Sequence, residues 1–121
     1  MTDIERYNVG PRMSEAIIHN GVLYLAGQVP KNAEADEVAQ TREVLESIET
    51  LLKQYGSDKS RMLTCQIFLS DITKFGLMNE VWDAWVVPGR TPTRATLQAP
   101  LAHPKKFIEV IVSAALNPRV A

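Results

Sequence analysis

The sequence predicts a single α+β domain in which one mixed sheet carries two helices on one face. A chain of 121 residues is long enough for one hydrophobic core and too short for two. Apolar residues recur with helical spacing in two separate segments. Short apolar or alternating runs, typical of strands, lie before, between and after these segments. The resulting order, β-β-α-β-α-β-β across residues 1–121, is that of a two-layer sandwich.

The first predicted elements are a hairpin and a helix. Two apolar runs within residues 16–27 flank Asn20-Gly21, a dipeptide that readily adopts the two positive-φ positions of a type I′ turn. Over residues 36–55 apolar side chains recur every three or four positions. This spacing predicts an amphipathic helix that Gly56 ends.

The later elements are a strand, a helix and two more strands. Residues 61–70 form an apolar run rich in strand-favouring residues. Residues 74–86 have a helical stripe of apolar side chains that stops before a Pro-Gly pair. Residues 94–99 and 106–116 are the last two strands. Asn79 lies on or beside the apolar stripe of the second helix, where it either satisfies a backbone group or points into a pocket.

The final strand contains a carboxylate, Glu109, inside an apolar run. Its neighbours on both faces of that run are apolar: Phe107, Ile108, Val110, Ile111 and Val112. Alternation puts Phe107 and Ile111 on the same face as Glu109. Because both faces are apolar, the pattern predicts a strand that is buried on both sides. A buried carboxylate left without a partner costs about 3–5 kcal/mol. We therefore expect a partner or a hydrated pocket beside Glu109.

Arg94 is the nearest upstream candidate for that partner. It is the one charged residue of the strand-like segment 93–98. A guanidinium binds a planar carboxylate through two parallel hydrogen bonds, and a nearby glutamate can activate water. Arg94 and Glu109 are thus suited to chemistry on a carboxylate substrate. A structural salt bridge between neighbouring strands is an equally open interpretation.

Composition and charge exclude several classes of function. The 13 Lys and Arg residues nearly balance the 14 Asp and Glu residues, and no basic cluster exceeds Lys105-Lys106. The chain therefore lacks the basic surface of a nucleic-acid-binding protein. The N-terminus has no basic region followed by an apolar stretch, and no segment has the length of a membrane span. We expect a cytoplasmic protein that binds neither nucleic acid nor membrane.

Residues with reactive or metal-binding side chains are few. Cys65 is the single cysteine and alternates onto an apolar face, so we expect an inert core residue. His19 flanks the predicted hairpin turn, and no second His, Cys or acid stands at ligand spacing from it. The sequence therefore predicts no metal site.

The strands also predict self-association. Two helices cover only one face of a sheet, yet the strands at 62–70 and 107–116 have apolar residues on both faces. Another copy of the chain is the natural cover for the second face. Closed symmetric oligomers are the usual solution, and a trimer with Glu109 or Arg94 near a subunit boundary is expected.

Several short blocks occur together in the order found in a known family. They are residues 10–17, 25–30, Gln40, 78–82, 92–94 and 108–110. These blocks span nearly the whole chain, which resembles the Rid family of reactive intermediate deaminases, also called endoribonuclease L-PSP or translation inhibitor proteins. Residues 82–87 are most similar to the YoaB-like branch.

The resemblance implies a chorismate-mutase-like fold and a homotrimer with sites in the clefts between subunits. It implies hydrolysis of 2-imino acids or their enamine tautomers to 2-keto acids and ammonia, without a cofactor. It also assigns roles to residues. Arg94 binds the substrate and Glu109 positions water, while further contacts come from Asn79 and from the backbones of Gly27 and Thr96.

Three departures from the family pattern concern substrate choice. Arg12 replaces a pocket tyrosine, Ala26 replaces a serine, and Ile111 replaces a second acid. A second cation at the pocket should favour imino acids with an acidic or polar end. That Arg12 instead solvates a subunit edge is equally open.

Three other functions are compatible with the same residues. The first is a trimer that binds or senses a small carboxylate metabolite without significant turnover. The second is a ribonuclease, which the balanced charge disfavours. The third is a structural or chaperone-like trimer in which Arg94 and Glu109 form only a salt bridge.

Overall fold

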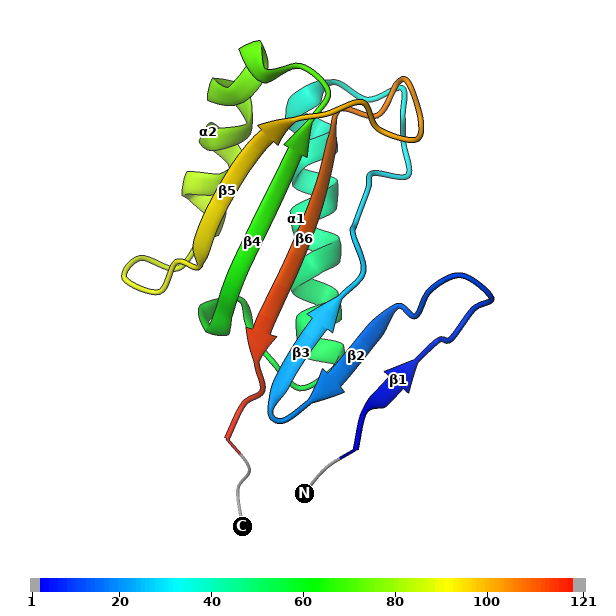
Figure 1. The fold of residues 1–121 in the computed structure, drawn as a ribbon. Coiled ribbons are helices and arrows are strands. Elements are labelled where there is room, and N and C mark those ends of the chain that lie inside the picture. The colour runs from blue at the N-terminus through cyan, green and yellow to red at the C-terminus, as the bar shows by residue number, and fades with distance from the viewer. Residues whose placement is uncertain (1–2, 119–121) are drawn as a thin grey trace.

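The protein, described here from a computed structural model of residues 3–118, has a six-stranded mixed sheet covered on one face by two helices (Figure 1). The strands are β1 (Glu5–Tyr7), β2 (Ala16–His19), β3 (Val22–Leu25), β4 (Met62–Leu69), β5 (Thr93–Gln98) and β6 (Ile108–Ala115). The helices are α1 (Glu37–Gln54) and α2 (Phe75–Trp85), and short 3-10 helices precede β4 (Lys59–Arg61) and α2 (Ile72–Lys74). The predicted α+β fold class is confirmed.

The two longest strands, β6 and β4, are neighbours in the sheet and lie between β3 and β5. The order is β1-β2-β3-β6-β4-β5. Only β4 and β5 pair in parallel, with α2 as the crossover between them, and the other pairs are antiparallel. As a result β4 lies between β5 and β6, a point on which the site depends.

Local signals in the sequence account for the turn and the helix end. Asn20 and Gly21 have φ angles of 50° and 77°, which confirms the two positive-φ positions of the predicted turn. Gly56 has a φ of 86° directly after the C-cap of α1. At the other end of α1, the Asp36 side chain accepts a hydrogen bond from the Ala39 backbone nitrogen at 2.8 Å.

The edge strand β1 was not predicted. It has only three residues, too few for an alternating pattern to be recognisable, and it pairs antiparallel with β2. A tertiary contact holds it, because the Tyr7 ring packs against the Tyr55 ring at the end of α1 with centroids 5.1 Å apart. The Tyr55 hydroxyl also donates a hydrogen bond to Glu15, just before β2.

The core lies between the helices and one face of the sheet. The buried apolar residues of β6 alternate along the strand from Ile108: they are Ile108, Val110, Val112 and Ala114. Ser113, on the other face, is buried as well. Phe107 precedes the strand and is buried in the same core, so the expected placement of Phe107 on the Glu109 face is wrong. Its backbone nitrogen donates to the buried side chain of Gln40 on α1 at 2.7 Å.

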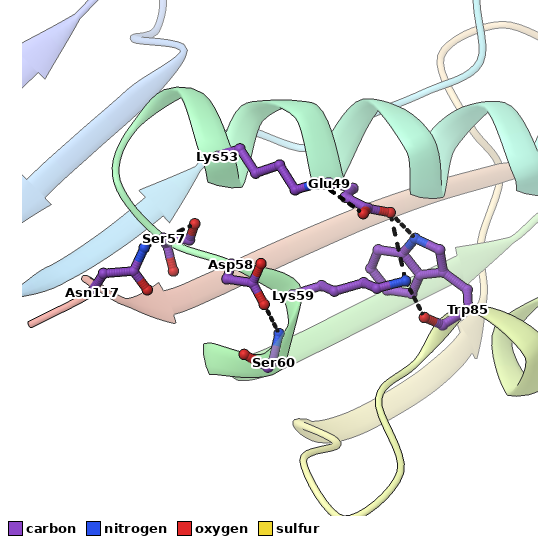
Figure 2. A network of polar contacts seen from close by, with 8 residues as sticks. All are labelled: Glu49, Lys53, Ser57, Asp58, Lys59, Ser60, Trp85 and Asn117. Atoms are coloured by element: carbon purple, nitrogen blue, oxygen red, sulfur yellow. Dashed lines mark hydrogen bonds and ion pairs between the residues drawn. The ribbon is translucent and has the colours of Figure 1, made fainter.

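A polar clamp fastens α2 to α1 (Figure 2). The Trp85 indole nitrogen donates to Glu49 on α1 at 3.0 Å, and the Lys59 ammonium donates to the Trp85 carbonyl at 2.7 Å. Partial burial acts to raise the pKa of Glu49, but the hydrogen bonds from Lys53 and Trp85 and the positive charges of Lys59 and Lys53 together outweigh it, so this pKa is lowered. The clamp fixes where α2 lies over the sheet.

The face of the sheet opposite the helices is open in a single chain. Two large side chains on it, Tyr24 and Leu97, are each 49% exposed.

None of the helices within residues 3–118 is long and apolar enough to cross a membrane.

Candidate functional site

Arg94 lies on β5 with its side chain against α2. Its backbone position is opposite Cys65 of β4, whose side chain is in the core, so Arg94 points to the helix-covered face. Arg94 Nη1 donates to Asn79 Oδ1 at 2.8 Å. The guanidinium carbon also lies 5.1 Å from the Trp82 ring centroid and 5.6 Å from that of Phe75, within cation–π range. One helix therefore holds this cation through three side chains.

No carboxylate among residues 3–118 forms an ion pair with Arg94. The ion pairs formed among residues 3–118 involve lysines only, so the charge of the half-buried guanidinium is unpaired within this part of the chain. Burial raises the pKa of the neighbouring Cys65 thiol to about 12, and the positive charge of Arg94 opposes this rise. The thiol therefore stays protonated at neutral pH, in agreement with an inert core residue.

Glu109 is the second residue of β6 and lies against the backbone of Gly27. The chain after β3 is held to β6 by a pair of hydrogen bonds between Gln28 and Val110, at 2.8 and 2.9 Å. This pairing brings Gly27 beside the carboxylate. A Cβ atom at Gly27 would lie only 2.3 Å from Glu109 Oε2, so the absence of a side chain there makes room for the carboxylate.

Arg94 and Glu109 do not meet within one chain. Glu109 pairs with Phe68 and Arg94 with Cys65, and positions 65 and 68 of β4 point to opposite faces. The intervening strand also separates them laterally. A salt bridge between neighbouring strands of one chain, left open by the sequence, is therefore wrong. Each chain presents two candidate half-sites, Arg94 with Asn79 on the helix side and Glu109 with Gly27 on the open face.

Comparison with known proteins matches this arrangement to one family. The family model described as Endoribonuclease L-PSP matches residues 5–116, nearly the whole chain. The chain belongs to the endoribonuclease L-PSP family. This family includes the Rid and YjgF proteins, in agreement with the resemblance drawn from the sequence.

Relatives of this endoribonuclease L-PSP chain include proteins of the RutC family. RutC family protein YoaB of Escherichia coli K12 is 44% identical over 113 residues, covering 93% of this chain and 98% of YoaB. A RutC family protein of Haemophilus ducreyi is 40% identical over 114 residues, covering 94% and 97% of the two chains. A crystal structure of a YjgF family member from Neisseria meningitidis superimposes with a TM-score of 0.91 at 42% identity, covering 97% and 98%.

The remaining predicted site residues of this endoribonuclease L-PSP chain lie in two places. Thr96 is on β5 two residues after Arg94 and on the same face, and its buried hydroxyl has no hydrogen-bond partner within residues 3–118. Arg12 is exposed on the loop between β1 and β2, at the opposite edge of the sheet from β5 (Figure 1). Arg12 and Arg94 of one chain therefore do not share a pocket.

Phe75 and Trp82 also belong to the Arg94 half-site. Both lie in the apolar helical stripe predicted over residues 74–86, a pattern that indicates core packing and does not reveal a contact with Arg94. A signal was present, however. Phe75, Asn79 and Trp82 stand at positions i, i+4 and i+7, which lie on one side of a helix.

Proposed function

We propose that this protein is a cofactor-independent deaminase that hydrolyses 2-imino acids, or their enamine tautomers, to 2-keto acids and ammonia. The observation that carries the proposal is the Arg94 guanidinium, held by α2 and without a carboxylate partner among residues 3–118. Only one of its five N–H donors goes to Asn79. The others suit the fork of a substrate carboxylate.

The reaction needs a fixed carboxylate and an activated water. With the substrate carboxylate on Arg94, water attacks C2 of the protonated imine while Glu109 accepts a proton from that water. The resulting carbinolamine then takes the proton from Glu109 onto its nitrogen. As the C2–N bond breaks, Glu109 takes the hydroxyl proton, the hydroxyl oxygen becomes the keto oxygen and ammonia leaves; this proton then passes to the ammonia, which departs as ammonium. General acid–base help of this kind contributes about 10²- to 10⁴-fold in rate.

A complete site needs two protomers under this proposal. Arg94 and Asn79 of one protomer would meet Glu109 and Gly27 of the next, because the two half-sites face different sides of one chain. The backbone of Thr96 would help to hold the water. Arg12, exposed on the β1–β2 loop, would reach a pocket only across a subunit boundary or else solvate its edge.

We predict a homotrimer at micromolar concentration, because the open face of the sheet leaves Tyr24 and Leu97 half exposed. Sedimentation should give three times the 13.5 kDa mass of the chain. Leu97→Lys, on the open face, should shift the mass toward the monomer. Ala84→Lys, on the exposed side of α2, is the matched control and should not. A wild-type protein that stays monomeric would contradict the shared site.

The activity is tested by generating imino acids in place. An amino-acid oxidase supplies them from a panel of amino acids, and semicarbazide competes for the imine. An active protein increases free keto acid and ammonia at the expense of the semicarbazide adduct. Binding of keto acids without this increase would instead identify a metabolite-binding or sensing trimer.

We predict that Gly27→Ala lowers turnover by about 10²-fold, since the new methyl group displaces the Glu109 carboxylate. Stability should change little, because the clash is with the mobile end of a side chain. Gly76→Ala is the matched control, as a Cβ there has no neighbour within 4 Å. Comparison of kcat and Tm for the two variants checks the prediction. Full activity of Gly27→Ala would separate Glu109 from the reaction.

A further inference from the structure

The Arg94 guanidinium is held by an aromatic pair, Phe75 and Trp82. Both rings come from α2 and flank Asn79, which binds Nη1 of the same guanidinium. The rings lie 5.6 and 5.1 Å from the guanidinium carbon. Hydrogen bonding at one nitrogen does not by itself fix the plane of a guanidinium, whereas stacking on aromatic rings restricts it.

The orientation of the Arg94 guanidinium before binding affects its affinity for a carboxylate ligand. An arginine on a long flexible side chain loses rotamer freedom when it binds, and this loss lowers affinity. A guanidinium whose plane is already set loses less and presents its remaining donors in one direction. The clamp between Glu49 and Trp85 ties α2 to α1 and so keeps the rings in place (Figure 2).

We propose that Phe75 and Trp82 are positioning residues that fix the plane of the Arg94 guanidinium for the substrate carboxylate. This inference rests on the proposed function of Arg94 and deepens it. The two rings differ in a way that makes the proposal testable. Trp82 is 6% exposed and belongs to the core, whereas Phe75 is 37% exposed at the start of α2. Phe75 can therefore be changed with little effect on folding.

The test compares Phe75→Leu with Phe75→Tyr in the full-length protein. Leucine keeps an apolar side chain and removes the aromatic face, whereas tyrosine keeps the face. The first readout needs no ligand: the Arg94 Nε–H signal in NMR, assigned by its loss in Arg94→Ala. Phe75→Leu should remove its ring-current shift and lower its order parameter, and Phe75→Tyr should preserve both.

The second readout is binding and turnover, with pyruvate as the probe for a 2-keto acid. Phe75→Leu should raise the Kd of pyruvate and the KM about three- to tenfold, with kcat changed less than about twofold. Phe75→Tyr should restore the wild-type values, and Tm should stay close to wild type in both variants.

The two readouts distinguish failure of the inference from failure of the proposed function. An unchanged Arg94 signal and unchanged Kd in a folded Phe75→Leu protein would overturn the positioning role. A wild-type protein that binds no pyruvate and hydrolyses no imino acid would overturn the carboxylate role of Arg94, and with it the purpose assigned to the aromatic pair. A disordered Arg94 signal in Phe75→Leu together with weaker pyruvate binding supports both.

Discussion

Replacing Arg94 with alanine is expected to lower kcat/KM for 2-imino acids by at least about 10²-fold. The variant loses both bonds of the guanidinium fork, and each charge-assisted bond contributes about 1.5–3 kcal/mol. Folding should survive, because Arg94 has no ion pair among residues 3–118 and its loss leaves only the Asn79 amide oxygen without a donor. The measurement is the coupled keto-acid assay together with thermal unfolding.

Two control variants sharpen this result. Arg94→Lys keeps the charge and loses the planar fork, so its activity should fall between those of wild type and Arg94→Ala. Arg42→Ala removes an exposed arginine from α1 and should leave kcat/KM unchanged. A folded Arg94→Ala protein with wild-type activity would remove Arg94 from the site.

Replacing Glu109 with glutamine is expected to separate binding from chemistry. Glutamine has nearly the same shape and can still hold a water molecule, but it cannot accept a proton. Turnover should therefore fall by about 10²-fold or more, while the Kd of pyruvate stays near that of wild type. Turnover, pyruvate affinity and Tm are measured on one preparation.

Thermal stability distinguishes the proposed catalytic role of Glu109 from a structural one. Glu109 has no ion-pair partner among residues 3–118, so neutralising it within one chain leaves no cation unpaired. A large fall in Tm, with activity reduced only in proportion to the folded fraction, would indicate that Glu109 is a buried partner across a subunit boundary. Retained turnover in a folded Glu109→Gln protein would contradict water activation and most of the proposed mechanism.

The sequence was sufficient for the elements whose signals are local. Asn20-Gly21 dictates its turn because few dipeptides tolerate two positive φ angles, and Gly56 ends α1 for the same reason. Helical periodicity identified α1 and α2 because the core lies on one side of each helix. The short strand β1 was missed because its pairing with β2 and the Tyr7–Tyr55 contact are tertiary.

For the candidate site, the sequence by itself determined which charged residues stand out, and the tertiary structure decided how they are grouped. Arg94 and Glu109 stood out as charges within apolar strands. Alternation gives the two faces of each strand separately, but it does not say which strand lies between two others or how their registers align. The insertion of β4 between β5 and β6 separates Arg94 from Glu109 laterally, and the registers of β5 and β6 on β4 put the two side chains on opposite faces. Packing of α2 near β5 then brought Asn79, Phe75 and Trp82 into contact with Arg94. These contacts depend on how the helix lies over the sheet, and the i, i+4, i+7 spacing of the three residues indicates only that they share one side of the helix.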